Sequence, residues 1–536
     1  MTTETGSFKR SLSLLDMTLL GFGAIFGSGW LFAASHVAAM AGPAGILAWV
    51  GGGVAVFFLG LVYCELSAAL PEAGGIVRHP ARTHGPLLGA LLGFITVLAY
   101  TSLTSLEIIA ARQYLGSWVP GLTRNSAGDP TLAGWFLQFF ALMLMMKLNM
   151  SKMTVFAFVN NIVTFFKFLV PALVIVLLLM RMHPENYTSH GFAPFGLSRL
   201  ETAISTGGVI FAYLGLTPII AAAGEARSPQ RTIPLALIFS VLLAVVVYVL
   251  LQAAFVGAVP PDMLAGGWEP IGRLFSLPFH DLAVVLGLTW LAKAVVTDAI
   301  VSPSGTGNIY MGASARILYA WAQTGTLSRW FLRVHPESGI PRRAVFVTFL
   351  MTIFWTLPFP SWDALIGVVS SALVMSYAFA PVAAGALRRA APELPRPFRV
   401  PFFSFTSPLA FMLATLIIYW TGKSILTGLL LAQLIFLFVS GGIFTVLHRS
   451  RIQDELRNCW WVILYFSGLL ALSWCGSVGG ANILPAPYDA LLTAGFSVLV
   501  YQFGIRQFCA EASIVDSEEI ILHAQSGALS SAVVGS

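Results

Sequence analysis

Four glycines stand within nine residues at positions 21–29, which read G-F-G-A-I-F-G-S-G inside a segment long and apolar enough to cross a bilayer. Glycine weakens a helix, and hydrocarbon offers no partner to a free N–H or C=O, so a break at that depth must be surrounded by protein or water. A second apolar segment, 204–223, repeats the pattern with Gly207, Gly208, Gly215 and Pro218. Two glycine-interrupted spans in corresponding halves of a chain are typical of a transporter substrate site.

A broken helix exposes N–H groups where its second half begins and C=O groups where its first half ends. The N–H groups suit a carboxylate and the carbonyls suit an ammonium, so an α-amino acid zwitterion would satisfy both. We expect the carboxylate at Gly27, Ser28 and Gly29, and the amine at the carbonyls of Ile25, Phe211 and Leu214, beside Gly215. The Phe211 ring would close over the bound molecule or serve only in packing. The alternative for the glycines is close helix packing.

Lys167 lies about twelve residues into the apolar segment 155–180, near the middle of the bilayer. A charged lysine costs roughly 2.5–3.5 kcal/mol there, so it needs a partner or must lose its proton. Pro171 lacks an N–H and frees the carbonyl of residue 167. We interpret Lys167 as a proton-coupling group, protonated in one state and neutral in another; the alternative is a side chain that reaches out to water.

Two acidic residues in apolar segments are further candidates for proton coupling. Glu107 follows Thr104 by three residues and shares its helical face. It could pair with Arg112 or Lys167, relay protons or line an entry path, and a structural ion pair is the alternative. Asp298 could likewise take part in proton coupling or form a structural ion pair, and a pair with Lys293 is favoured.

The composition excludes most other classes of protein. Of 536 residues, 57% are hydrophobic and only 10% charged, and the mean hydropathy is +0.83, whereas soluble domains have roughly 25% charged residues. The sequence holds no Ser-His-Asp set, HExxH motif, Walker loop or pair of catalytic carboxylates in a soluble context. We therefore expect an all-α integral membrane protein without catalytic residues, metal or cofactor, whose net charge of +6 reflects membrane orientation rather than nucleic-acid binding.

Fourteen apolar runs are candidates for membrane spans. With the N-terminus inside, most of the 29 lysines and arginines fall on the cytoplasmic side, as the positive-inside rule requires. Both termini, 1–10 and the tail 507–536, are then cytoplasmic. The runs are 13–38, 45–70, 87–111, 131–149, 155–180, 202–223, 235–258, 284–320, 343–358, 363–387, 404–420, 425–446, 459–475 and 487–506.

Several charged residues fall at the cytoplasmic ends of these spans, where we expect them to form an inner ionic gate or to fix topology: Glu65, Glu225, Arg227, Arg231 and Arg316. In the second cytoplasmic loop, His79 and His84 are expected to be solvated.

Five strings resemble the amino acid–polyamine–organocation (APC) permeases over residues 11–445: G-A-I-F-G-S-G-W at 23–30, Y-C-E-L-S-A-A-L-P-E-A-G-G at 63–75, I-F-A-Y-L-G-L at 210–216, G-E-A-R-S-P-Q-R-T-I-P at 224–234 and S-A-R-I-L-Y-A-W at 314–321. The resemblance implies a LeuT-like 5+5 inverted repeat, with 11–180 and 200–388 as the repeats, helices 1 and 6 discontinuous, and additional helices 11–14 in 389–506. It also implies a substrate-side position for Thr104 and Tyr310 and a helix-five lysine at the position of Lys167.

Within this family the chain shows a closer resemblance to the bacterial aspartate–proton symporters. The similarity rests on G-S-G-W-L-F-A at 27–33, A-Y-T-S-L-T-S-L-E-I-I-A-A-R-Q-Y at 99–114, G-F-A-P-F-G at 191–196, F-S-L-P-F-H-D at 275–281 and F-W-T-L-P-F-P-S-W at 354–362. It implies import of L-aspartate together with protons through the cytoplasmic membrane. Thr217 and Ala223 stand where many relatives carry acidic residues, so substrate details of those relatives do not transfer.

The alternative function within transport is an antiporter that exchanges substrate for product, as glutamate–GABA exchangers do. A membrane-embedded enzyme lacks support from any catalytic constellation, and a channel is disfavoured because two broken helices at one site suit occlusion better than continuous flow. The expected partners are an amino acid, protons and lipid, and a homo-oligomer is compatible with the sequence.

Overall fold

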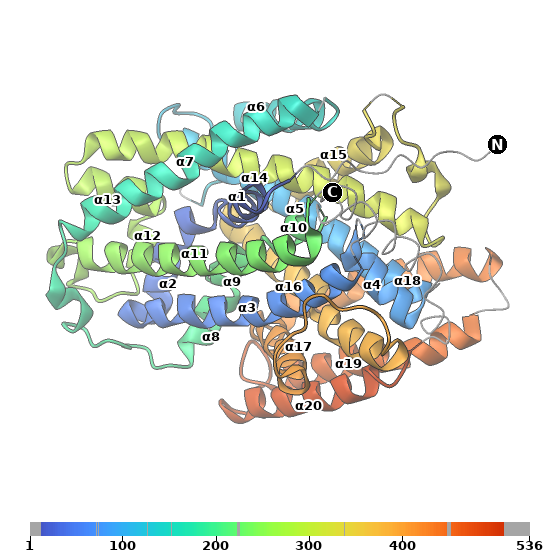
Figure 1. Ribbon diagram of the computed structural model, residues 1–536. Helices are drawn as coiled ribbons and strands as arrows, with labels where there is room; N and C mark the ends of the chain where they lie inside the picture. Colours follow the sequence, from blue (N-terminus) through green and yellow to red (C-terminus); the bar gives the residue numbers. More distant parts are fainter. Residues whose placement is uncertain are drawn as a thin grey trace, which may run out of the picture.

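The protein is built from α-helices. The computed structural model describes residues 12–508 apart from 71, 73, 126, 152, 222–225, 337 and 448–451. Within these residues the only β-type pairing consists of two isolated bridges. The long helix α11 packs against both α3 and α7 (Figure 1). In chain order the α-helices are α1 (Leu14–Ile25), α2 (Gly29–Ala41), α3 (Gly45–Ala69), α4 (Gly75–His84), α5 (Pro86–Leu115), α6 (Leu132–Asn149), α7 (Met153–Leu179), α8 (Arg199–Ser205), α9 (Val209–Tyr213), α10 (Leu216–Ala221), α11 (Pro229–Ala258), α12 (Ile271–Leu274), α13 (Pro278–Val285), α14 (Thr289–Gln323), α15 (Arg342–Thr356), α16 (Trp362–Ala390), α17 (Phe403–Trp420), α18 (Lys423–Leu447), α19 (Ile452–Cys475) and α20 (Tyr488–Gly504).

The first glycine-rich segment contains a short non-helical stretch. Helix α1 begins with a capping box, in which Ser13 Oγ accepts from the Asp16 N–H at 3.2 Å and the Asp16 carboxylate accepts from the Ser13 N–H at 2.8 Å. It ends at Ile25, and α2 begins at Gly29. Residues 26–28 between them are not helical, so the interruption lies within the glycine-rich stretch 21–29.

The second glycine-rich segment is divided into the short helices α8, α9 and α10. Gly208 precedes α9 with a φ of 95°, which a glycine adopts without the clash that a Cβ would cause. Leu214 and Gly215 separate α9 from α10. The helix axis bends by 46° between α8 and the segment that follows it.

The described residues contain seven helices long and apolar enough to cross a membrane, or eight if the bent α8–α10 series is one span. Each of the fourteen predicted ranges overlaps a helix, or a series of helices at 13–38 and 202–223. Several of these helices are shorter, such as α1 and the part of α7 at Phe166–Leu179. Fourteen crossings therefore remain a prediction.

Large apolar side chains cover much of the outer surface. Leu132, Phe438 and Ile463 are 71%, 86% and 65% exposed on three different helices. A soluble monomer rarely carries such extensive apolar surface, because contact with water is unfavourable. In hydrocarbon the same side chains find apolar neighbours, so this is the surface of a protein embedded in a membrane.

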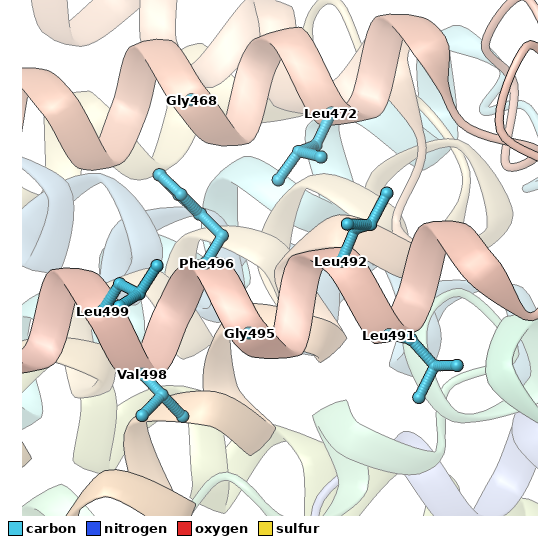
Figure 2. Close-up of a pocket in the computed structure, with 8 residues that line it drawn as sticks. All are labelled: Gly468, Leu472, Leu491, Leu492, Gly495, Phe496, Val498 and Leu499. Carbon is cyan, nitrogen blue, oxygen red and sulfur yellow. The ribbon is translucent and has the colours of Figure 1, made fainter.

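The helices after α16 gather on one side of the bundle, where α17 packs against α3, α16 and α20, and α19 packs against α20 (Figure 1). An apolar groove of about 750 Å³ lies between α19 and α20, and Figure 2 shows the residues that line it. Its lining residues are Gly468, Leu472, Leu491, Leu492, Gly495, Phe496, Val498 and Leu499. An open groove without polar lining suits lipid chains rather than a charged substrate.

Helix α4 corrects the expectation that its two histidines are solvated. His79 and His84 are buried, with the His79 ring bonded to the Leu70 carbonyl at 3.0 Å and the His84 ring bonded to the Gly504 carbonyl at 3.0 Å. Burial lowers the pKa of both rings, that of His84 to about 4. The composition of this loop suggested that both histidines face water. They are buried instead because neighbouring helices pack against α4 and the end of α20 meets His84.

Candidate functional site

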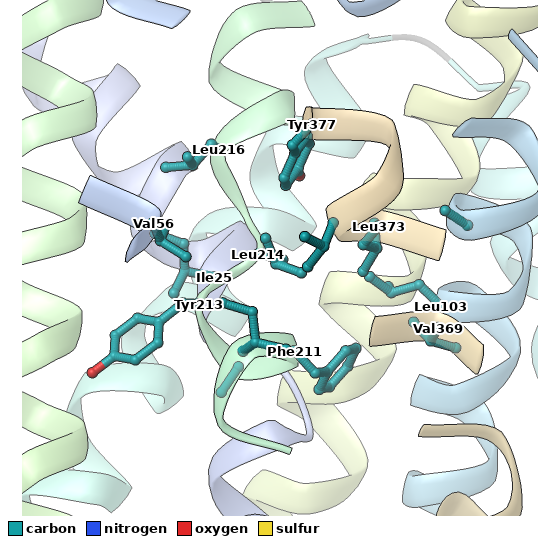
Figure 3. Packing of buried hydrophobic residues seen from close by; sticks show 14 of the residues in the cluster. Ile25, Val56, Leu103, Phe211, Tyr213, Leu214, Leu216, Val369, Leu373 and Tyr377 are labelled. Atoms are coloured by element: carbon teal, nitrogen blue, oxygen red, sulfur yellow. The ribbon is translucent and has the colours of Figure 1, made fainter. Parts of the chain in front are cut away.

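The two non-helical segments meet in the interior of the bundle. A Cβ added to Gly215 would lie 2.5 Å from Ile25 Cα, and a Cβ added to Gly29 would lie 2.8 Å from Ala212 Cα. Only glycine permits backbones to approach so closely. Figure 3 shows Ile25, Phe211 and Leu214 in the buried apolar cluster that surrounds this meeting point.

Each carbonyl that we expected to receive a substrate amine has a donor within the protein. The Ile25 carbonyl accepts from Tyr248 Oη at 3.1 Å, and that of Leu214 accepts from Tyr310 Oη at 2.5 Å. The Phe211 carbonyl accepts from the Leu214 N–H at 3.1 Å. A carbonyl oxygen has two lone pairs, so an ammonium would share these acceptors or displace the tyrosines. Tyr248, which sequence reasoning missed, is one of the few polar side chains within the apolar helix α11.

Glu107, from α5, occupies the start of α2. Its Oε2 accepts the Ser28 N–H at 2.8 Å, and a Cβ at Gly27 would collide with its Oε1. The side chain is fully buried, and Oε1 has no hydrogen-bond partner within the described structure. An internal carboxylate thus sits where the sequence predicted the carboxylate of a ligand.

Lys167, from α7, reaches the last turns of α1. Its ammonium donates to the Gly23 carbonyl and to Thr306 Oγ1, the latter at 2.6 Å. The Thr306 hydroxyl also lies 3.4 Å from the Phe26 carbonyl. The buried amine therefore joins α7, α14 and the C-terminal end of α1, where helix carbonyls favour a positive charge. Thr306 was not predicted; it lies in an apolar-looking segment whose polar face only the fold reveals.

Asp298 is buried on α14 but does not pair with Lys293, which corrects the expected structural pair. Its Oδ1 accepts from Ser302 Oγ at 2.9 Å, and Oδ2 has no hydrogen-bond partner among the described residues. Lys293 is exposed five residues away on another face of the helix. Five residues correspond to 500° of rotation at 3.6 residues per turn, which separates the two side chains.

Arg112 does not pair with Glu107 either. Its Nη2 donates to the carbonyls of Gly128 at 2.6 Å and Pro360 at 3.0 Å. It therefore ties α5 to the segment that precedes α6 and to the segment that precedes α16. Of the partners that the sequence left open for Glu107, Lys167 is near enough for their charges to interact, while the ammonium itself donates to Gly23 and Thr306.

Thr104 and Tyr310 lie near the same breaks. Thr104 Oγ1 donates to the Tyr100 carbonyl at 2.9 Å and lies 3.4 Å from the Gly307 carbonyl of α14. The rings of Tyr310 and Tyr100 meet edge to face at 5.0 Å. The rings of Phe211 and Trp362 also meet edge to face, with their centroids 6.3 Å apart. Trp362, at the start of α16, packs against Phe32 and His36 of α2. It ends the family-like string at 354–362, but the sequence alone assigned it no function.

The charges at the predicted inner end are arranged differently from the expected gate. Glu65 is buried and accepts from Arg388 Nε and Nη2 at 2.7 Å each and from the Val400 N–H at 2.8 Å. Arg396 approaches it at 3.6 Å. Glu225 lies outside the described residues, as do segment 1–10 and the tail from residue 509. Glu65 thus ties α3 to the end of α16 and the segment that follows it.

In chemical terms, the site holds two buried carboxylates and one buried amine around two meeting helix interruptions. Among the described residues no cluster of three or more His, Cys, Asp or Glu could hold a metal ion. Buried ionisable groups in an apolar bundle mark a path for a charged substrate or a proton. A helical membrane protein with such a site is a transporter by class.

Comparison with known proteins identifies the family. A model of the amino acid permease family matches residues 12–440. Over 502 residues the chain is 46% identical to the aspartate-proton symporter of Bacillus subtilis (strain 168), covering 93% of this chain and 96% of that protein. It is 34% identical over 540 residues to the glutamate/serine transporter AimA of the same organism, covering 97% and 98%. The chain belongs to the amino acid permease family of the APC superfamily, and the resemblance inferred from its motifs is confirmed. It is a multi-pass membrane transporter, not an enzyme.

Proposed function

We propose that this permease imports L-aspartate together with protons across the cytoplasmic membrane. The observation that carries the proposal is the hydrogen bond from the Ser28 N–H to Glu107 Oε2 at 2.8 Å. The carboxylate of Glu107 accepts from the Ser28 N–H, which is the donor that we propose for the carboxylate of the substrate. Proton binding and substrate binding at this position are then thermodynamically linked.

The proposed fold gives this site its place in the membrane. Helices α1 and α2 form one discontinuous crossing, and α8–α10 form a second. Segments 11–180 and 200–388 are two inverted five-helix repeats, and the helices of 389–506 bring the total to about fourteen. Both termini, 1–10 and 507–536, lie in the cytoplasm, as the distribution of lysine and arginine supports.

Coupling at Glu107 follows from competition between carboxylates. While Glu107 is ionised it holds the Ser28 N–H, and a substrate carboxylate arriving at Gly27, Ser28 and Gly29 would meet a like charge at close range. A proton on Glu107 removes that charge and weakens its hold on the N–H. The substrate carboxylate then takes the donor, so substrate binds best together with a proton.

Lys167 provides the second half of the coupling. Its ammonium bridges the end of α1 to Thr306 of α14. Loss of its proton would remove the charge that attracts these oxygens and loosen α1 from α14. Asp298, buried on the same α14 helix, is a third group that could exchange protons with this set.

Substrate identity rests on the relatives. The relative at 46% identity is named as an aspartate-proton symporter and the one at 34% as a glutamate/serine transporter, so two similar proteins handle acidic amino acids by name. In this chain, two hydroxyls lie near the breaks: Tyr310 Oη is 2.5 Å from the Leu214 carbonyl, and Thr104 Oγ1 is 3.4 Å from the Gly307 carbonyl of α14. We propose them as the groups that read the side chain of the substrate.

The test uses purified full-length protein in liposomes with radiolabelled aspartate, glutamate, serine and leucine. We expect aspartate to accumulate when the outside is acidic and the inside alkaline, and to accumulate far less without the gradient. Uptake seen only in liposomes preloaded with a counter-substrate would identify an exchanger instead. Accumulation of leucine but not aspartate would refute the proposed substrate while leaving the family unchanged.

A further inference from the structure

Trp362 stands at the start of α16 and is almost completely buried. Its indole ring stacks on Phe32 at 4.8 Å and on His36 at 5.7 Å, with interplanar angles of 12° in both pairs. Phe32 and His36 are one turn apart on α2, so the indole covers one face of that helix. Phe211 of α9 meets the same ring edge to face.

The indole N–H is directed at the interrupted segment. Trp362 Nε1 donates to Ser28 Oγ at 3.1 Å. Ser28 in turn gives its N–H to Glu107 Oε2 at 2.8 Å. One line of donors therefore runs from Trp362 through Ser28 to Glu107.

Trp362 is held in this position from several sides. Its backbone N–H donates to Gln113 Oε1 of α5 at 3.0 Å. A Cβ at Gly208 would lie 2.9 Å from the far edge of the indole. Its neighbour Asp363 pairs with His36 Nε2 at 3.3 Å. The start of α16 therefore contacts α2 in two ways, through the stacked Trp362 ring and through the pair between Asp363 and His36.

We propose that Trp362 is a positioning residue that links closure of α16 over α2 to the ionisation of Glu107. A serine hydroxyl that accepts one hydrogen bond directs its own proton elsewhere, which in the proposed closed state is toward the carboxylate. Ser28 then offers Glu107 its hydroxyl as well as its N–H, which favours the ionised form. When α16 moves away, the hydroxyl is free to rotate and the carboxylate retains its proton more readily. This inference rests on the proposed proton-coupled function.

The decisive variant is Trp362→Phe, which removes the indole N–H and retains a ring that can stack on α2. The matched control is Trp355→Phe on α15, because Trp355 Nε1 also donates to a hydroxyl, Thr101 Oγ1, at 3.1 Å. In proteoliposomes we expect Trp362→Phe to reduce gradient-driven accumulation about tenfold, the effect of losing a hydrogen bond that acts on a charged group. Counterflow without a gradient should stay within about twofold of wild type, because stacking and folding are retained.

A double-mutant cycle provides the second measurement. If Trp362 acts through Ser28, the losses in Ser28→Ala and Trp362→Phe should not add in the double variant. Trp362→Phe that behaves like Trp355→Phe, or losses that add independently, would overturn the inference. Failure of the wild type to accumulate aspartate under the same gradient would instead refute the proposed function.

Discussion

Gly215 lies directly against the backbone of Ile25, so that a Cβ at position 215 would come within 2.5 Å of Ile25 Cα. This contact joins the end of α1 to the segment just before α10, and it brings the backbone groups of the two non-helical segments close together. The glycines at the breaks therefore do two things. They allow the helices to end, and they allow the ends to touch.

We predict that Gly215→Ala abolishes transport. The obstructing atoms belong to the Ile25 backbone and cannot rotate away, so overpacking should destabilise the protein by about 1–3 kcal/mol or separate the breaks. Aspartate uptake and thermal stability in detergent measure the two effects. Gly428→Ala on α18 is the control, because a Cβ there meets nothing within 4 Å; equal losses in both variants would contradict the predicted contact.

We predict that Lys167→Ala loses accumulation driven by a proton gradient and keeps exchange of labelled for unlabelled substrate. The variant removes the amine that bridges Gly23 and Thr306 but leaves the backbone groups of both breaks. Lys293→Ala, at an exposed position of α14, should transport normally. Gradient-driven uptake that continues unchanged in Lys167→Ala would refute the coupling role.

We predict that Glu107→Gln makes substrate affinity insensitive to pH. In the wild type, affinity for aspartate should fall as pH rises, because ionised Glu107 competes for the Ser28 N–H. The amide of the variant has no charge to lose, so its affinity should be flat. Binding of labelled aspartate to purified protein between about pH 5 and 8 tests this, a range in which carboxylates can titrate when perturbed. A wild-type pH slope that persists in the variant would assign the slope to another group.

We predict that Glu65→Gln destabilises the protein strongly. Removing one partner of a buried ion pair costs about 3–5 kcal/mol, and the loss here should be toward the lower end because Arg388 reaches solvent. Thermal unfolding in detergent and yield after purification measure it. Glu269→Gln, at an exposed position, should have no measurable effect, and a similar small effect at Glu65 would contradict the buried pair.

We predict that stability falls on acidification and that His84 causes part of the loss. Burial lowers the pKa of His84 to about 4 in the folded protein, against about 6.5 in an unfolded chain. Its stabilising contribution is therefore complete above pH 6.5 and is lost as pH falls from there toward 4, because the unfolded chain binds the proton first.

The check is the thermal midpoint in detergent between about pH 5 and 7.5, the interval in which an unfolded histidine titrates. His84→Gln should reduce the dependence on pH, and the exposed His190→Gln should leave it as in the wild type. Some dependence should remain in His84→Gln, because burial lowers the pKa of His79 as well. An unaltered pH dependence in His84→Gln would show that the ring titrates normally.

The sequence by itself determined the class of the protein and pointed to the two glycine-rich segments that contain non-helical residues. Apolar runs of membrane length are set by bilayer thickness, and clustered glycines act locally through backbone conformation, so both can be read along the chain. The same local reasoning placed Lys167 and Glu107 in apolar segments and marked them as needing partners.

Only the tertiary structure decided what those partners are. Glu107 bonds Ser28, 79 positions earlier in the chain, and Lys167 reaches Thr306 on α14 rather than another charge. Asp298 turned out not to pair with Lys293, and His84 not to face water. Which side chains meet depends on how each helix is rotated about its axis and packed against its neighbours. The spacing of residues along the chain does not specify that rotation.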